Sequence, residues 1–232
     1  MYFFRPRDII SGDFSLLVKR KKHGDVVGGV GDCTGHGIPA ALLSVLCHEI
    51  LMSSIKKHKE LSTVISKLNK SIIRIFSRLD KENSVADALD LILFRVIPSE
   101  SRIEISGIKR PFIHYNSSTN THDYYSLKGK SIGTPFADDE EIPSMQFTYN
   151  DNDYFYFFTD GVTDQFGGPN QKKLMKKGLI SCLNNLSQMP PLKREIELDI
   201  FLRKWQDKTA QTDDMLFIGI SPSNVNLKIN SK

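Results

Sequence analysis

GDCTGHGIPAA (Gly31 to Ala41) is the stretch that most constrains the fold. It places one carboxylate, that of Asp32, in a glycine-rich turn directly after an apolar, strand-like run at 26–30. Pro39 suits the first turn of a helix, and the free amide hydrogens at a helix start favour an anion. The stretch therefore indicates phosphate chemistry, and an ordinary strand-to-helix turn is the alternative.

Three further turns carry acids beside apolar segments. They are SGDF with Asp13, FTDGVTDQFGG with Asp160, and QTDDMLFIGI with Asp213 and Asp214. A single acid at a strand end is normally a solvated turn residue. Four such turns form a more specific pattern, because an all-oxygen site for hard divalent cations collects carboxylates from separate loops.

The order of these motifs, with GIKRPF at 107–112 between them, resembles the SpoIIE-type bacterial branch of the PPM family of metal-dependent Ser/Thr protein phosphatases. The resemblance extends from about Tyr2 to Ile220. It implies an α+β fold, a PPM phosphatase-like central antiparallel β-sandwich flanked by helices in α-β-β-α layers. Runs of strands with helices grouped in pairs independently favour α+β layers over alternating βαβ units.

The resemblance also implies a site for two divalent cations, Mn²⁺ or Mg²⁺, which suit oxygen ligands. Asp32 would bridge the two cations, and the main-chain oxygen of Cys33 would bind one of them. Asp13 would bind on the Cys33 side, directly or through water, while Asp160 and Asp213 would complete the other. We therefore expect catalytic roles for Asp32, Asp160 and Asp213, and metal binding by Asp13, Asp32, Cys33, Asp160 and Asp213.

Several roles stay open at this level. Asp214 could replace Asp213, and because adjacent side chains of an extended segment point oppositely, one of the two should face away. Proton delivery to the leaving oxygen could come from His36 or from a metal-bound water. Asp87 and Asp90 resemble an acidic stretch of the same branch, where they would support the site or the fold, with binding of a third metal as the alternative.

The function that the resemblance implies is hydrolysis of phosphoserine or phosphothreonine on a regulatory protein, by attack of a metal-bridging water. An anti-sigma-factor antagonist is one candidate partner. The alternative is a pseudophosphatase, a partner-binding module that keeps the fold without turnover. No substrate-binding residue is assigned; candidates for holding phosphate are Arg5, Arg7, Lys109 and Arg110, each with a structural or solvated-loop role as the alternative.

Composition agrees with a single PPM-type domain over residues 1–232. The chain has 232 residues, of which 40% are hydrophobic, enough for one substantial core. Its net charge of +4 is too small to indicate a nucleic-acid partner. Three widely spaced cysteines predict free thiols and a reducing, cytoplasmic setting, and the absence of a leader or a run of eighteen apolar residues argues against membrane insertion. We also expect the module to follow a sensor region in a longer protein or to form a homodimer.

Periodicity predicts the individual elements. The helices are expected at 38–55, 61–79, 171–184 and 192–205. The strands are expected at 2–4, 14–18, 26–30, 88–97, 102–106, 112–115, 122–126, 145–149, 154–159 and 215–220.

Overall fold

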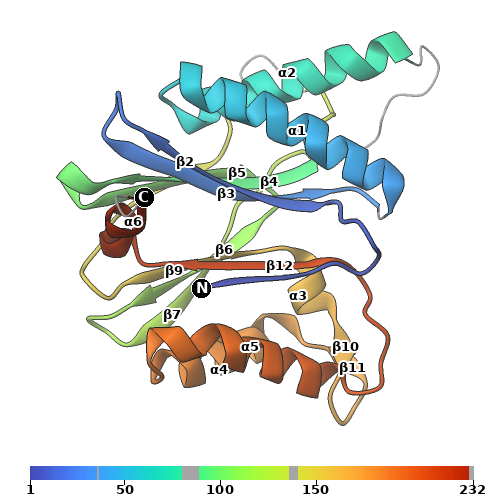
Figure 1. Cartoon of the computed structure of the whole chain (residues 1–232), viewed down its shortest axis with the longest axis vertical. Coiled ribbons are helices and arrows are strands. Elements are labelled where there is room, and N and C mark those ends of the chain that lie inside the picture. Colours follow the sequence, from blue (N-terminus) through green and yellow to red (C-terminus); the bar gives the residue numbers. More distant parts are fainter. Residues whose placement is uncertain (36, 80–88, 136–140, 230–232) are drawn as a thin grey trace.

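The computed structural model describes residues 1–232 apart from 36, 80–88, 136–140 and 230–232. Two five-stranded antiparallel sheets face each other, with a pair of long helices outside each sheet (Figure 1). The predicted α-β-β-α sandwich is therefore confirmed.

The two sheets draw their strands from both halves of the chain. The first sheet has the order β1 (Tyr2–Arg5), β12 (Met215–Ile220), β9 (Tyr154–Phe158), β6 (Pro111–Asn116) and β7 (Thr121–Ser126). The second has the order β2 (Asp13–Arg20), β3 (Asp25–Cys33), β4 (Leu89–Ile97), β5 (Arg102–Ile108) and β8 (Ser144–Thr148). The chain crosses from the second sheet to the first between β5 and β6.

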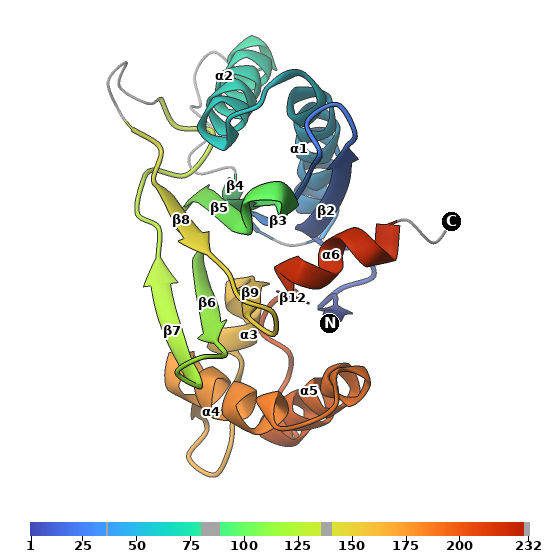
Figure 2. The ribbon, with the colours of Figure 1, turned by 90° about the vertical axis from the view of Figure 1, so that its left-hand side faces the viewer.

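Helices α1 (Ile38–Lys57) and α2 (Leu61–Leu79) cover the second sheet, and α4 (Met175–Ser187) and α5 (Pro191–Gln206) cover the first (Figure 2). These elements match the predicted ones, although α4 begins four residues later than the expected position 171. Short elements were missed: the 3-10 helix η1 (Pro98–Glu100), α3 (Asp160–Asp164), β10 (Phe166–Gly167), β11 (Lys172–Lys173) and α6 (Pro222–Ile229). Position 88, expected to begin a strand, lies outside the described residues.

Strands in the middle of the sandwich are buried on both faces. In β4, Leu91 and Leu93 pack toward α1 and α2, whereas Ile92 and Phe94 pack between the sheets. Successive side chains of a strand point to opposite faces, so a continuous apolar run fills two layers of core at once. The aromatic run of β9 divides in the same way between the inter-sheet core and the α4–α5 core.

Glycines in β3 make room for aromatic rings. A Cβ on Gly28 would lie 2.3 Å from the Phe94 ring, and one on Gly31 would lie 2.4 Å from the Phe14 ring. The strand consequently continues through Gly31 to Cys33, and Asp32 is a strand residue. The expectation that Asp32 sits in the glycine-rich turn was wrong, because these glycines serve close packing within the sheet rather than a change of direction.

Helix α1 is long and apolar enough to span a membrane by length and composition alone, and about a third of its apolar stretch is buried in the protein. Length and composition are weak evidence for a membrane span, since core helices of water-soluble proteins are often equally long and apolar. Here α1 packs on β2, β3 and α2 and contributes Cys47, Leu51 and Ile55 to the core beneath it.

A buried ion-pair network lies at the end of the second sheet where β2 ends and β3 begins. The Asp25 carboxylate accepts hydrogen bonds from Arg20 at 2.6 and 2.7 Å and from Arg95 Nε at 2.6 Å. Arg20 also donates to the carbonyl oxygen of His58 at 2.6 Å, where α1 ends, and Arg95 pairs with Glu104 at 3.1 Å. Burial alone would raise the pKa of Asp25, but these hydrogen bonds outweigh it and lower the pKa.

We predict that Asp25→Asn lowers the free energy of unfolding by about 3 kcal/mol at neutral pH, because two buried arginines lose their shared anion. The lowered pKa means that the stabilisation is present above about pH 4 and is lost as acid protonates Asp25 in the folded state. Urea unfolding between pH 3 and 7 should therefore show a smaller acid-induced loss of stability in the variant. Glu100→Gln, which breaks an exposed pair with Arg102, is the control and should cost less than about 1 kcal/mol.

Candidate active site

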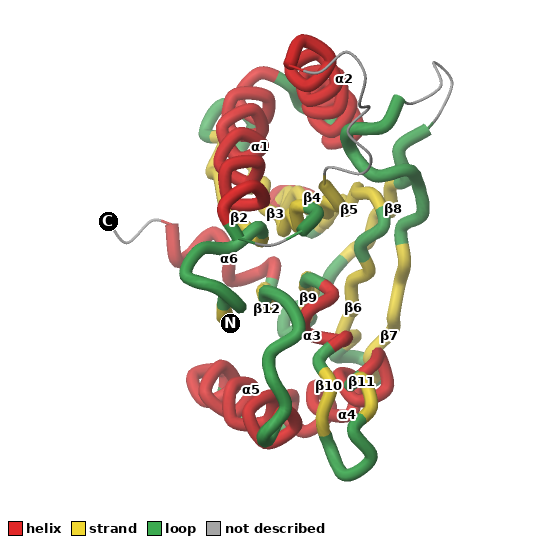
Figure 3. Tube along the Cα trace, turned by 90° about the vertical axis from the view of Figure 1, so that its right-hand side faces the viewer, coloured by secondary structure: helices red, strands yellow, loops and turns green. Residues whose placement is uncertain are grey.

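Strand ends of both sheets meet at one end of the sandwich, beside α3 (Figure 3), and the predicted acids lie at or next to these strand ends. Asp13 begins β2, Asp32 is the penultimate residue of β3, and Asp160 follows β9. Asp213 directly precedes Asp214 and β12. Antiparallel pairing within each sheet and packing of the two sheets on each other bring these ends together, although they are up to 200 positions apart in the chain.

Three aspartates form a row across the second sheet. Asp13 pairs in register with Asp32, and Asp32 pairs with Asp90 on the next strand. The first two were predicted site residues, whereas Asp90 was left between a supporting and a metal-binding role. Directly opposed like charges destabilise a sheet, so this row needs cations or protons to persist.

Arg110 supplies such a positive charge. Its Nη2 atom lies 2.8 Å from a carboxylate oxygen of Asp32 and 3.3 Å from oxygens of Asp90 and Asp160. Burial works against the charged guanidinium, but these carboxylates outweigh it and raise the pKa of Arg110. The sequence left Arg110 between a phosphate-holding and a structural role; its side chain, 6% exposed, lies at the centre of the cluster.

The crossover between the sheets places Arg110 there. Strand β5 ends at Ile108, Lys109 adopts a left-handed conformation with φ of 57°, and Pro111 begins β6 in the other sheet. The side chain of Arg110 thus enters the gap between strands of the two sheets. Spacing along the sequence gives no sign of this position, which depends on the crossover.

Asp160 is the first residue of α3, not part of an irregular turn as predicted. The helix approaches the start of β12 closely: a Cβ on Gly161 would lie 1.9 Å from the carbonyl oxygen of Asp214. Glycine at 161 is therefore required to bring Asp160 and Asp213 toward each other. The carboxyl group of Asp213 has a raised pKa, chiefly from burial and with a contribution from Asp160.

Asp213 and Asp214 face different ways, as the extended segment predicted. Asp214 is 3% exposed and accepts hydrogen bonds from the backbone amides of Arg7 and Gly12, at 2.7 and 2.9 Å. It thereby holds the segment that leads into β2 and Asp13. The structure gives Asp214 a scaffold role and leaves Asp213 as the acid of this pair beside Asp160.

Thr159 is a contributor that the sequence analysis did not single out. Its hydroxyl donates to Asp13 at 2.6 Å and accepts from the Leu216 amide at 3.0 Å. Thr159 directly follows β9, so one side chain connects an acid of the second sheet with two strands of the first. The sequence signal that could have indicated this role is the position of Thr159, a hydroxyl residue directly before Asp160.

Crowding of carboxylates in a buried place shifts their pKa values. Burial raises the pKa of Asp32 to about 7, with Arg110 opposing the shift and Asp160, Asp213 and Asp90 adding to it. Burial together with the neighbouring Asp32 raises the pKa of Asp13 to about 9. With its carboxylates ionised, the cluster would hold more negative charge than Arg110 neutralises, a condition that favours binding of further cations.

Cys33 directs its side chain away from the acids. The thiol belongs to the core beneath α1, where a hydrogen bond with Cys47 and burial raise its pKa far above the usual value. A thiolate ligand is thereby disfavoured, and the main-chain oxygen stays the predicted ligand. All three cysteines are free and buried.

The donor set fits hard divalent cations in chemistry but is not closed around one point. In the described part of the chain, no group of three or more His, Cys, Asp or Glu side chains is arranged to hold one metal ion. The oxygens of Asp32, Asp90 and Asp160 nevertheless converge on a single cationic nitrogen, Arg110 Nη2. An all-carboxylate set that already surrounds a positive charge suits Mg²⁺ or Mn²⁺.

Arg5, Arg7 and His36, which the sequence suggested for phosphate binding or proton transfer, lie away from the carboxylate row or outside the described residues. Arg5 donates to Gln206 and Met215, and the backbone and side chain of Arg7 contact Asp214 and Thr212. Among the described residues, neither side chain contacts the row of Asp13, Asp32 and Asp90. The candidate proton donor His36, and Asp87, lie outside the described residues.

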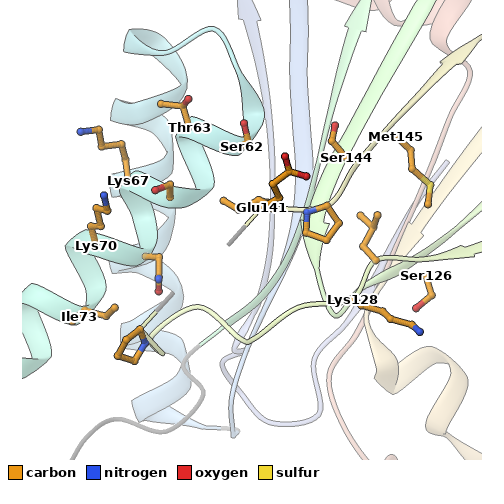
Figure 4. A pocket seen from close by; sticks show the side chains of 16 residues that line it. Ser62, Thr63, Lys67, Lys70, Ile73, Ser126, Lys128, Glu141, Ser144 and Met145 are labelled. Carbon is orange, nitrogen blue, oxygen red and sulfur yellow. The ribbon is translucent and has the colours of Figure 1, made fainter. Parts of the chain in front are cut away.

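A pocket of about 480 Å³ opens over the cluster and is lined by Asp90, Lys109, Arg110, Asp160 and Thr163, among others. A larger groove of about 980 Å³ runs between α2 and the β7–β8 region, and Figure 4 shows Thr63 on one wall and Ser144 on the other. The two share residues 126–128, so the groove leads to the carboxylate cluster.

The family model of stage II sporulation protein E (SpoIIE) matches residues 22–222. This is most of the chain, so the protein belongs to the SpoIIE family, the SpoIIE-type branch of the PPM phosphatases. The resemblance stated from the motifs is confirmed. A search of curated proteins finds no match.

Solved structures share the fold at low sequence identity. The SiaA-PP2C domain of Pseudomonas aeruginosa is 19% identical with a TM-score of 0.81, covering 95% of this chain and 85% of that one. The phosphatase domain and regulatory fragment of SpoIIE from Bacillus subtilis is 12% identical with a TM-score of 0.76, covering 94% and 61%. RsbX in complex with magnesium is 15% identical with a TM-score of 0.64, covering 94% and 92%.

We predict that Gly161→Ala lowers the free energy of unfolding by about 1–3 kcal/mol, because the added methyl group meets the backbone of Asp214. The displacement should also separate Asp160 from Asp213 and weaken Mn²⁺ binding. Thermal unfolding and calorimetric Mn²⁺ titration measure the two effects. Thr163→Ala in the same helix is the control, and equal losses in both variants would contradict the close-packing explanation.

Proposed function

We propose that this chain is a metal-dependent protein serine/threonine phosphatase that uses two divalent cations, Mg²⁺ or Mn²⁺. The observation that carries the proposal is the convergence of the Asp32, Asp90 and Asp160 carboxylates at the end of a PPM sandwich. The match to RsbX in complex with magnesium supports divalent-cation use.

The residues divide the work as follows. Asp32, Asp160 and Asp213 would hold the cations, and Asp160 also lines the pocket; Asp13, fixed by Thr159, would add a carboxylate on the Cys33 side. When bound, paired divalent cations lower the pKa of a water and stabilise the charge of a phosphoryl group during in-line attack. The chain therefore needs no nucleophilic side chain of its own.

The substrate class follows from the family and from the relatives. We propose phosphoserine or phosphothreonine on a regulatory protein, for which an anti-sigma-factor antagonist is one candidate. A structure of the RsbU and RsbW domains of Rv1364c from Mycobacterium tuberculosis, 17% identical with a TM-score of 0.70, shares the fold. The groove between α2 and the β7–β8 region offers a place for polypeptide on either side of the phosphorylated residue.

We further propose that the chain acts as one domain, because both sheets share an inter-sheet core that spans β3 to β12. A neighbouring sensor region, a homodimeric state and a cytoplasmic location stay predictions. The chain covers 61% of a SpoIIE structure that includes a fragment of a regulatory domain.

We predict that the purified protein hydrolyses a phosphoserine peptide with Mn²⁺ or Mg²⁺, and that Asp32→Asn lowers kcat by at least about a hundredfold, since it removes charge from the centre of the cation site. Phosphate release with and without EDTA is the measurement. Asp164→Asn is the matched control. It removes a half-exposed carboxylate at the end of α3 that pairs with Lys173, and it should keep full activity.

A folded wild-type protein without turnover under either metal would contradict the proposal. Persistent activity of Asp32→Asn would contradict the assigned role of Asp32.

A further inference from the structure

We propose that Arg110 binds the phosphoryl group of the substrate and that Asp90 is the positioning residue that holds its guanidinium. The inference rests on the proposed hydrolase function and names a substrate-binding residue of that site.

Several N–H groups of the Arg110 guanidinium make no contact with the carboxylates. Arginine presents five N–H groups in a planar fork, yet all three carboxylate contacts of Arg110 use Nη2 alone. Its Nε is buried without a hydrogen-bond partner, and its Nη1 makes no hydrogen bond with any residue that the structure describes. A buried donor left unpaired is costly, so the fork as a whole favours an added acceptor.

Two of the three carboxylate contacts overlap with the proposed cation ligands. Asp32 and Asp160 belong to the predicted metal set, and a guanidinium within 2.8–3.3 Å of their oxygens repels a second cation there. Asp90 lies outside that set. With the metal ligands engaged, Arg110 therefore keeps Asp90 as its anchor and turns its remaining donors to other acceptors.

Asp90 is itself fixed. One of its carboxylate oxygens accepts from the Ser131 hydroxyl at 2.7 Å, and the other lies 3.3 Å from Arg110 Nη2. Its place in the row is set by the register of β4 with β3, where it pairs with Asp32. Ser131, Asp90 and Arg110 thus form a chain of contacts from the loop that precedes β8 to the centre of the cluster.

The pocket brings an anion to this chain. Arg110, Asp90 and Asp160 all line the pocket of about 480 Å³ over the cluster. A phosphoryl group that reaches Asp160 from this pocket lies beside the guanidinium. Arginine stays charged at any working pH, and its fork matches two phosphate oxygens, so it offsets the repulsion between phosphate and the surrounding carboxylates.

The test is calorimetric and does not use hydrolysis. Wild-type protein, Arg110→Gln, Asp90→Asn and Lys109→Gln are first titrated with Mn²⁺ and then, saturated with Mn²⁺, with inorganic phosphate. We expect Arg110→Gln to weaken phosphate affinity by about tenfold or more, as for a lost charge-assisted hydrogen bond, with Mn²⁺ affinity unchanged or tighter. Asp90→Asn should weaken phosphate affinity in the same direction without loss of Mn²⁺ affinity.

Lys109→Gln is the matched control, since it removes a positive charge one position away in the same pocket. An equal loss in Lys109→Gln would show a general charge effect and overturn the proposal. So would phosphate affinity within about twofold of wild type in Arg110→Gln, loss of Mn²⁺ binding in either Arg110→Gln or Asp90→Asn, or absence of phosphate binding by the wild type.

If Arg110→Gln does not fold, Arg110→Lys replaces it, because this variant keeps the charge and loses only the fork. It should then weaken phosphate binding by about threefold or more, and wild-type affinity would overturn the proposal. If phosphate binding depends on Arg110 but the protein shows no turnover, the proposed function is contradicted and this inference is still supported.

Discussion

Repulsion among carboxylates at one end of the sandwich is the constraint around which this site is organised. Asp13, Asp32 and Asp90 lie side by side across three strands, and Asp160 and Asp213 approach them from the other sheet. No ordinary sheet end tolerates such a concentration of negative charge without compensation. Arg110 provides part of it from within the chain, but burial together with the neighbouring carboxylates still raises the pKa values of Asp13 and Asp32.

The sandwich makes this arrangement possible because both of its sheets are held rigidly from two sides. The inter-sheet core fixes the distance between the strand ends, and the helix layers hold the outer faces. Asp25 with its two arginines ties α1 to the far end of the second sheet, while Asp214 ties the entry of β2 to the start of β12. Acids carried by different sheets can therefore stay close despite their repulsion.

Much of the fold could be predicted from the sequence because its signals are local. The apolar runs of β4 and β9 and the stripe of α2 gave the long elements, and the order of acidic motifs gave the family. The glycines of β3 misled the prediction, since a glycine signals a turn and a close ring contact equally well. Short α3 and the β10–β11 hairpin were missed, because a few residues give too little periodicity to detect.

The sequence by itself determined the family, through it the α-β-β-α architecture, and four acids of the candidate site, because short motifs mark the family and the acids. Only the tertiary structure decided which of Asp213 and Asp214 turns toward Asp160, that Thr159 holds Asp13, and that Arg110 stands among the carboxylates. These facts depend on strand register and on the crossover from β5 to β6. Both arise from pairing between segments that are far apart in the chain, and no local pattern records them.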